Sequence, residues 1–156
     1  MGVKPIPEGY NTINPYVAVP KAADAIEFYK RAFGAKERSR MDGPGGTIAH
    51  AELEIGDSVI MLSDPFPQAR TKSPKELGGT TVSLMVYVED VDEVVQQAVD
   101  AGATITMPIE NQFWGDRFGQ VEDPFGHNWQ IATHVEDVPP EEMAKRAEQA
   151  MAAMAQ

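Results

Sequence analysis

Hydrophobic and polar residues follow two spacings along the chain, and these predict helices and strands. Apolar residues at helical spacing predict amphipathic helices over 22–33 and 91–101, each followed by a glycine, Gly34 or Gly102. Short β-branched or alternating runs predict strands over these ranges: 12–19, 37–41, 48–55, 58–63, 81–88, 104–109, about 117–122, and 128–134. The chain therefore runs twice through the order β-α-β-β-β.

The two β-α-β-β-β units also repeat each other in sequence. Val17-Ala18-Val19 recurs 69 positions later as Val86-Tyr87-Val88, and Gly34-Ala35 recurs 68 positions later as Gly102-Ala103. A match at a nearly constant offset indicates duplication. We therefore predict an α+β fold of two tandem modules with a pocket built at the seam.

The expected organisation is one domain followed by a helix. The domain covers residues 1–137, with module one at about 10–64, a linker rich in Pro, Lys, Ser and Gly at 65–80, and module two at about 81–137. Residues 138–156 follow, where Pro139-Pro140 starts an amphipathic helix with a Met and Ala stripe. We expect this stripe to pack on the body of the protein, with a partner, lid or dimer contact as the alternative.

Alternation along the strands predicts which side chains face away from the helices. In the strand over 48–55, Ala49, Ala51 and Leu53 suit the helix side, which leaves His50 and Glu52 on the other face. The same argument gives a mixed polar and aromatic set from four strands: Asn14, Tyr16, His50, Glu52, Ser83, Met85, Tyr87, Gln130 and His134. This face is either the wall of a pocket or the wet side of a sheet.

Composition narrows the function classes. The 156 residues carry a net charge of −11, which disfavours binding to nucleic acid, and the absence of cysteine excludes disulfides and thiolate chemistry. No apolar run approaches the 18 or so residues that predict a membrane span, so neither a membrane nor a nucleic-acid partner is expected. No signal segment is recognised at the start of the chain, and a cytoplasmic location is the default expectation. Nucleotide-binding and serine-hydrolase motifs are also missing.

Several motifs carry a family resemblance. They are N-P-Y-V-A-V at 14–19, E-F-Y-K-R-A-F-G-A at 27–35, and E-D-P-F-G-H-N-W-Q-I-A-T-H-V-E-D at 122–137. Over about residues 10–137 the chain resembles the vicinal oxygen chelate superfamily of glyoxalase I, bleomycin and fosfomycin resistance proteins and extradiol dioxygenases. The segments 50–57, 61–64 and 113–117 are similar to its PhnB-like branch. The resemblance implies curled mixed sheets that surround a cavity with their concave faces, and a homodimer that pairs or swaps modules.

The resemblance also implies where a metal would bind. In metal-using members, ligands come from the first and last strands of each module, and the matching positions here are Asn14, Met61, Ser83 and Gln130. None of them is a His or a carboxylate, which such a cation needs. We therefore expect no cofactor and no standard metal site. A weakly bound divalent metal on the amide oxygens of Asn14 and Gln130 is the disfavoured alternative.

The candidate site residues support two hypotheses. His50 and Glu52 are the candidate catalytic pair. The candidate ligand-binding residues are Tyr16, Tyr87, Trp114, Arg117, Gln130 and His134. The first hypothesis is a glyoxalase-like or bleomycin-resistance-like protein that holds an unidentified small organic molecule between the modules. The alternative is a lyase or isomerase that uses His50 and Glu52 for acid–base chemistry or for an atypical metal. His127 is interpreted as a solvated loop residue.

Overall fold

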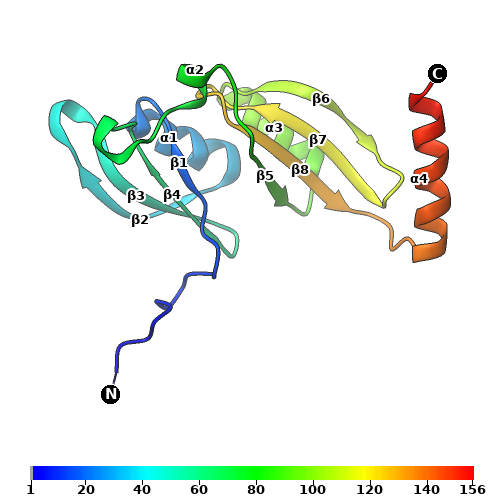
Figure 1. The fold of residues 1–156 in the computed structure, drawn as a ribbon, viewed down its shortest axis with the longest axis horizontal. Helices are drawn as coiled ribbons and strands as arrows, with labels where there is room; N and C mark the ends of the chain where they lie inside the picture. The colour runs from blue at the N-terminus through cyan, green and yellow to red at the C-terminus, as the bar shows by residue number, and fades with distance from the viewer. Residues whose placement is uncertain (1) are drawn as a thin grey trace.

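The computed structural model describes residues 2–156 and has two similar halves followed by a helix (Figure 1). The first half contains β1 (Tyr16–Ala18), α1 (Ala22–Phe33), β2 (Lys36–Asp42), β3 (Ile48–Ile55) and β4 (Ser58–Ser63). The second half contains β5 (Ser83–Tyr87), α3 (Val91–Ala101), β6 (Thr104–Asn111), β7 (Asp116–Glu122) and β8 (Asn128–His134). The short α2 (Pro74–Leu77) lies between them, and α4 (Pro140–Met154) follows β8.

Each half is one β-α-β-β-β module with its own four-stranded mixed sheet. The strand order is β1-β4-β3-β2 in module one and β5-β8-β7-β6 in module two. In both sheets the first strand pairs in parallel with the last, and the other pairs are antiparallel. The predicted α+β fold of two tandem modules with a C-terminal helix is therefore confirmed, although the sheets do not close around a cavity.

The duplication is also visible in the side-chain hydrogen bond that each module makes to the first N–H group of its crossover helix. In module one, Asp64 accepts hydrogen bonds from Ala22 N at 3.4 Å and from Ile48 N at 2.7 Å. In module two, Thr133 Oγ1 accepts from Val91 N at 2.9 Å and donates to the carbonyl of Val88. Residues 64 and 133 are 69 positions apart, as are residues 22 and 91. A side chain at the end of each parallel strand pair thus satisfies the first N–H of the crossover helix.

A buried network joins the two modules. Tyr29 of α1 donates its hydroxyl hydrogen to Asp123 Oδ2 at 2.6 Å, and Trp129 Nε1 donates to the same oxygen at 3.0 Å. Phe33 of α1 packs on Trp129 with ring centroids 4.4 Å apart. His127 Nε2 lies 2.9 Å from the carbonyl oxygen of Ala18, so it is a half-buried bridge between modules and the expectation of a solvated loop residue is wrong. One hydrophobic core runs through both modules.

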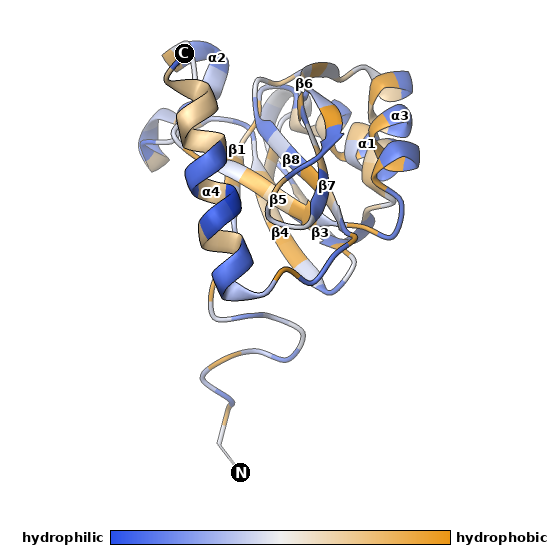
Figure 2. Ribbon diagram, turned by 90° about the vertical axis from the view of Figure 1, so that its right-hand side faces the viewer, coloured by the Kyte–Doolittle hydropathy of each residue, from blue (hydrophilic) through white to orange (hydrophobic). Residues whose placement is uncertain are grey.

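The helices cover one side of the sheets and leave the other side open. Figure 2 shows α1 and α3 together on one side of the strands and α4 on the opposite side. We call the sheet surface away from α1 or α3 the open face of each module. Tyr16 and Met41 on the open face of module one are 49% and 63% exposed, and Tyr87 on that of module two is 62% exposed. Within residues 2–156, the two sheets do not close to enclose a cavity between their open faces.

Two local differences from the sequence expectations have simple causes. β1 begins at Tyr16 rather than residue 12, because Pro15 has no N–H to donate to a ladder. The linker, expected to contain no regular element, includes α2, where Pro74 follows the capping residue Ser73, whose Oγ accepts from Glu76 N at 3.3 Å. Within residues 2–156, no helix combines the length and the apolar character needed to cross a membrane.

Candidate functional site

A continuous hydrogen-bonded chain of side chains crosses the open face of module one. The Tyr16 hydroxyl lies 3.0 Å from His50 Nδ1, and His50 Nε2 lies 3.0 Å from Glu52 Oε2. The Tyr10 hydroxyl donates to the other carboxylate oxygen of Glu52. Strand register explains why these side chains lie together. Tyr16 and Glu52 are both paired with Met61, one from each neighbouring strand, so they point to the same side of the sheet. We call these four side chains, Tyr10, Tyr16, His50 and Glu52, the relay.

The hydrogen bonds of the relay shift the pKa values of Glu52 and Tyr10. Hydrogen bonds from His50 and then from Tyr10 lower the pKa of Glu52, more than its partial burial raises it. The carboxylate is therefore ionised at neutral pH and acts only as an acceptor, so Nε2 of His50 carries the hydrogen. With that hydrogen on Nε2, the other ring nitrogen, Nδ1, is available to accept from the Tyr16 hydroxyl. The hydrogen bond to Glu52 raises the pKa of Tyr10, which keeps that phenol protonated.

A second cluster lies at one end of the open face of module two. Asp116 is 3% exposed, and its Oδ2 accepts from the Tyr87 hydroxyl at 2.9 Å and from Trp114 Nε1 at 3.1 Å. His134 Nδ1 lies 2.8 Å from Asp116 Oδ1, and His134 Nε2 lies 2.7 Å from Asp137. Three predicted ligand-binding residues, Tyr87, Trp114 and His134, thus meet at a carboxylate that the sequence argument did not single out.

Hydrogen bonding also shifts the pKa values in this second cluster. Burial raises the pKa of Asp116, but the hydrogen bonds from His134, Tyr87 and Trp114 together lower it below its ordinary value. The hydrogen bonds to Asp116 and then to Asp137 raise the pKa of His134. The imidazole therefore lies between two carboxylates and bonds one through each ring nitrogen.

The structure does not bring Arg117 and Gln130 into either cluster. Arg117 lies on the helix side of β7, where its guanidinium makes a two-pronged ion pair with Asp92 of α3 at 2.7 and 2.9 Å and contacts Asn111. Gln130 lies on the open face, opposite Met85 and Gln120 in the sheet. Among the predicted residues, therefore, the relay includes Tyr16, His50 and Glu52, and the second cluster includes Tyr87, Trp114 and His134.

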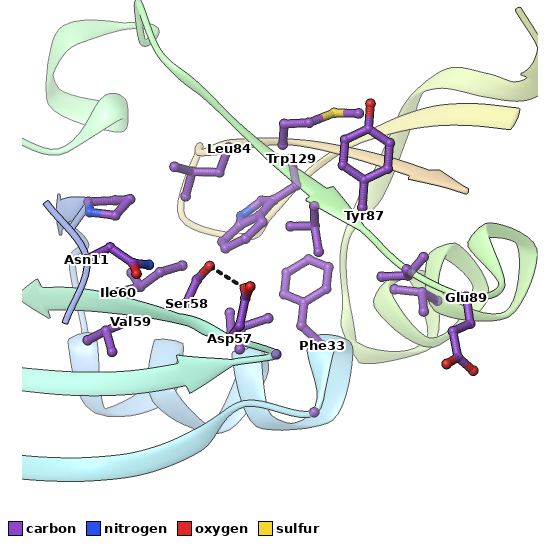
Figure 3. A pocket seen from close by; sticks show the side chains of 18 of the residues that line it. Asn11, Phe33, Asp57, Ser58, Val59, Ile60, Leu84, Tyr87, Glu89 and Trp129 are labelled. Carbon is purple, nitrogen blue, oxygen red and sulfur yellow. Dashed lines mark hydrogen bonds between the residues drawn. The ribbon is translucent and has the colours of Figure 1, made fainter. Parts of the chain in front are cut away.

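A cleft of about 860 Å³ lies between the modules, beside the unpaired edge of β5 (Figure 3). Its walls are mainly apolar and include Phe33, Ile60, Leu84 and Trp129. Polar groups at the cleft include Asn11, Asp57, Ser58, Glu89 and Gln97, and Ser58 donates to Asp57 at 3.0 Å. The volume is within the range of small-molecule sites. Of the residues predicted to bind a ligand, Tyr87 alone lines it.

Comparison with known proteins places the chain in a family. Residues 10–131 match the model of the Glyoxalase/Bleomycin resistance protein/Dioxygenase superfamily. The chain belongs to this superfamily. A Mycobacterium tuberculosis relative, Rv0887c, is 44% identical over 129 residues, which are 81% of this chain and 76% of the relative.

Solved structures share the arrangement of elements over most of this chain. The Arabidopsis thaliana protein At5g48480 is 29% identical, with a TM-score of 0.64 over 79% of this chain and 98% of its own. The PhnB protein from Bacillus cereus is 25% identical, with a TM-score of 0.59 over 79% of this chain and 99% of its own. The predicted resemblance to the superfamily and to its PhnB-like branch is confirmed.

The superfamily's metal positions do not fit a divalent ion in this member. The Asn14 amide is engaged by the backbone of Asn11, at 3.1 Å from Oδ1 and 2.6 Å from Nδ2. The other three positions supply a thioether, a hydroxyl and an amide, from Met61, Ser83 and Gln130. Four uncharged donors cannot neutralise a dication. Over residues 2–156, no three His, Asp or Glu side chains are grouped so that they could hold a metal.

Three important residues were missed from the sequence. Tyr10 precedes β1 in a segment with no periodic pattern, so its contact with Glu52 carries no sequence signal. Asp116 alternates with Phe118 and Gln120 along β7, which would have placed it on the open face. Asp123 begins the turn before β8, and its Oδ1 accepts from Phe125 N and His127 N at 2.9 and 3.0 Å. Such a turn can be recognised in the sequence. The buried contact between Asp123 and Tyr29 cannot be predicted from it.

Proposed function

We propose that this superfamily member is a homodimer that binds a small organic molecule on the open face of module one and moves a proton to or from it. The observation that carries the proposal is the relay, in which a phenol, an imidazole and a carboxylate are hydrogen-bonded in series. This order of groups is the one that activates a weak acid through a histidine held by a carboxylate.

Each member of the relay has a distinct role in the proposed reaction. Tyr16 is about half exposed, so its oxygen is accessible to a ligand. As a C–H or O–H bond of the ligand breaks, its proton goes to the Tyr16 oxygen and the phenolic proton goes to His50 Nδ1. The products are the anion of the ligand and an imidazolium, which Glu52 stabilises through Nε2. Return of the proton to the same or another atom completes an exchange or an isomerisation.

The exposed aromatic and apolar side chains on the open faces support the dimer. Met41 and Tyr87 are 63% and 62% exposed, and Met85 is 40% exposed. Groups of such side chains in water commonly mark an interface. A second copy that covered these faces would also enclose the relay, as proton transfer requires when water must be excluded. Sedimentation equilibrium of the purified chain tests this, and a monomer at micromolar concentration would contradict it.

Solvent deuterium exchange tests the chemistry without knowledge of the natural ligand. Small α-hydroxy and α-oxo acids, aldehydes and ketones are incubated with the protein in D2O, and loss of C–H signal is followed by NMR. We expect exchange above the buffer rate for at least one compound class. His50→Gln should slow it by about 10²–10⁴-fold, the usual contribution of a general base. Arg117→Gln is the matched control and should leave the rate unchanged.

The outcomes separate chemistry from binding alone. Equal exchange rates in wild type and His50→Gln would rule out the relay as the base. Absence of exchange with every compound, combined with binding of one of them, would leave a binding protein and reject proton transfer. Circular dichroism of His50→Gln checks that the fold is retained.

The inter-module cleft favours a second candidate function, ligand binding without reaction. A cavity of about 860 Å³ with apolar walls and a few polar groups suits a metabolite-sized molecule. Leu84→Trp would narrow this cleft from the β5 side without contacting the relay. If a compound binds in the cleft, Leu84→Trp should abolish its binding while His50→Gln leaves it intact. Binding on the open face of module one predicts the reverse pattern.

A further inference from the structure

The cleft between the modules contains negative charge without positive charge. Among residues 2–156, the charged side chains that line it are those of Asp57 and Glu89, and no lysine, arginine or histidine lines it. The other lining residues are uncharged, and most are apolar. A carboxylate beside an apolar surface is stabilised by an opposite charge, because the surface excludes part of the water that would otherwise solvate it. The lining therefore favours a cationic group on the ligand.

Asp57 is the carboxylate that points into the cleft. It lies in the turn between β3 and β4, and Figure 3 shows its side chain and that of Ser58 pointing toward the rings of Phe33 and Trp129. Ser58 donates to Oδ1 of Asp57 at 3.0 Å, which orients the carboxylate. Within residues 2–156, no hydrogen bond engages Oδ2. This second oxygen is therefore available to a donor on a ligand.

An aromatic ring lies beside this carboxylate. Phe33 is the last residue of α1, which ends at Gly34 with a φ of +66°. The Phe33 ring is held against Trp129, with ring centroids 4.4 Å apart, and both residues line the cleft. The face of an aromatic ring attracts a cation. A cation at this place is attracted by the ring and by the carboxylate, whereas an anion is repelled by the carboxylate and a neutral group gains little from either.

The remaining walls suit an apolar body attached to the cation. Val59 and Ile60 of β4 are buried on one side of the cleft, and Leu84 lies on the β5 side. The volume of about 860 Å³ is large enough for a molecule of metabolite size. Because the negative charge is local and most of the lining is apolar, the lining favours a ligand with one charged end and an uncharged body.

The open face of module one lacks this preference. Both oxygens of Glu52 are already bonded, Oε1 by the Tyr10 hydroxyl and Oε2 by His50 Nε2. The Arg38 guanidinium lies over the Tyr10 ring, 4.7 Å from its centroid, so a cation of the chain itself already occupies this aromatic face. The preference for a cationic ligand is therefore a property of the cleft and not of the relay.

We propose that the cleft binds an organic cation, a molecule with a protonated amine on an apolar body. The ammonium group lies between Oδ2 of Asp57 and the ring of Phe33, and the apolar body lies along Ile60 and Leu84. This inference rests on the second candidate function, ligand binding in the cleft, and names the chemical class of the ligand.

Three probes that share one ring system test the charge preference. Naphthylmethylamine, naphthylmethanol and naphthoate carry a positive charge, no charge and a negative charge. Their binding to the full chain is measured by equilibrium dialysis with naphthalene fluorescence, at a salt concentration that shortens the Debye length to about 8 Å and so screens the net charge of −11. We expect the amine to bind about tenfold more tightly than the alcohol, and naphthoate to bind most weakly.

A matched pair of variants locates the charge that is responsible. Asp57→Asn keeps an acceptor for Ser58 and suits a turn, so the fold should be retained, which circular dichroism checks. We expect it to weaken binding of the amine by about fivefold and to leave binding of the alcohol within about twofold. Glu54→Gln removes the same charge from an exposed position of β3 outside the cleft and should leave both affinities unchanged.

The outcomes separate the class of ligand from binding in the cleft. Equal affinity of wild type for the amine and the alcohol would overturn the proposal, as would equal effects of Asp57→Asn and Glu54→Gln. If Leu84→Trp still abolishes binding in either case, the cleft remains a binding site and only the preference for a cation is rejected. If none of the probes binds, or if Leu84→Trp leaves their binding intact, the second candidate function is rejected together with this inference.

Discussion

Replacement of Tyr29 by phenylalanine removes one hydrogen-bond donor from the buried network between the modules. Tyr29 is 1% exposed and Asp123 is 4% exposed. The Tyr29 hydroxyl is 2.6 Å from Asp123 Oδ2, and burial followed by the neighbouring Asp123 charge raises the pKa of Tyr29 well above its usual value. The phenol is therefore neutral at all working pH values and donates to the carboxylate.

The expected loss follows from what remains around Asp123. In Tyr29→Phe the carboxylate keeps three donors, Trp129 Nε1 at 3.0 Å and the backbone N–H groups of Phe125 and His127 at 2.9 and 3.0 Å. The ring stays in place, so no large cavity opens. Removal of a buried hydrogen bond to a charged group costs about 1.5–3 kcal/mol of the free energy of unfolding. For a chain of 156 residues, that lowers the melting temperature by roughly 3–12 °C.

Urea unfolding followed by circular dichroism measures this change, with the slope of the transition as a check for two-state behaviour. Tyr16→Phe is the matched control. Its hydroxyl is bonded to His50 on a surface where the ring is 49% exposed, so we expect a change of no more than about 0.5 kcal/mol. Because the network spans both modules, wild type and variant should each unfold in one transition.

Two results would refute this reasoning. If Tyr29→Phe unfolds within about 0.5 kcal/mol of wild type, the hydroxyl contributes no more than a surface group and Asp123 is adequately satisfied without it. If the wild type unfolds in two separate transitions, the modules are not joined by this network into one cooperative unit.

Two further predictions concern the segment around α4. The pKa of His134, followed by NMR titration, should lie above 6.5 and should fall in Asp116→Asn. Because the pKa is raised in the folded state, His134 stabilises the folded protein below pH 6.5, and this stabilisation is lost as the pH rises through the folded pKa. A value at or below 6.5 in wild type would contradict the hydrogen bonds to both carboxylates. Gly115→Ala should destabilise the protein by more than about 1 kcal/mol, because φ is +103° and a Cβ would lie 2.2 Å from a carbonyl oxygen. Gly79→Ala, with no atom within 4 Å, should change stability by less than about 0.5 kcal/mol, and equal effects would contradict this steric account.

The order of elements could be predicted from the sequence because it depends on local spacing. The helices over 22–33 and 91–101 and the strands over 48–55, 58–63 and 128–134 have the bounds that periodicity gave. Strand alternation likewise put His50 and Glu52 on one face, since successive side chains point to opposite sides. Periodicity did not predict α2 in the linker, because a single helical turn capped by Ser73 is too short to produce a periodic pattern.

The partners of the site residues could not be predicted in this way. Alternation gives the face of a strand but not which distant groups reach it, so the contact of Tyr10 with Glu52 was missed. Arg117 has the chemistry of an anion anchor, but it lies on the helix side of β7 and is paired with Asp92. The same alternation rule, applied from Arg117 to Gly119 and Val121, would have indicated that side.

The sequence by itself determined the duplicated β-α-β-β-β order, the family, and the uncharged set at the usual metal positions, because each depends on residue type and nearby spacing. The tertiary structure alone decided that Tyr29 and His127 join the modules and that the sheets stay open within one chain. It also left the end of α4 uncovered. Such outcomes depend on contacts between residues about 100 positions apart, and local pattern contains no information about which of these contacts form.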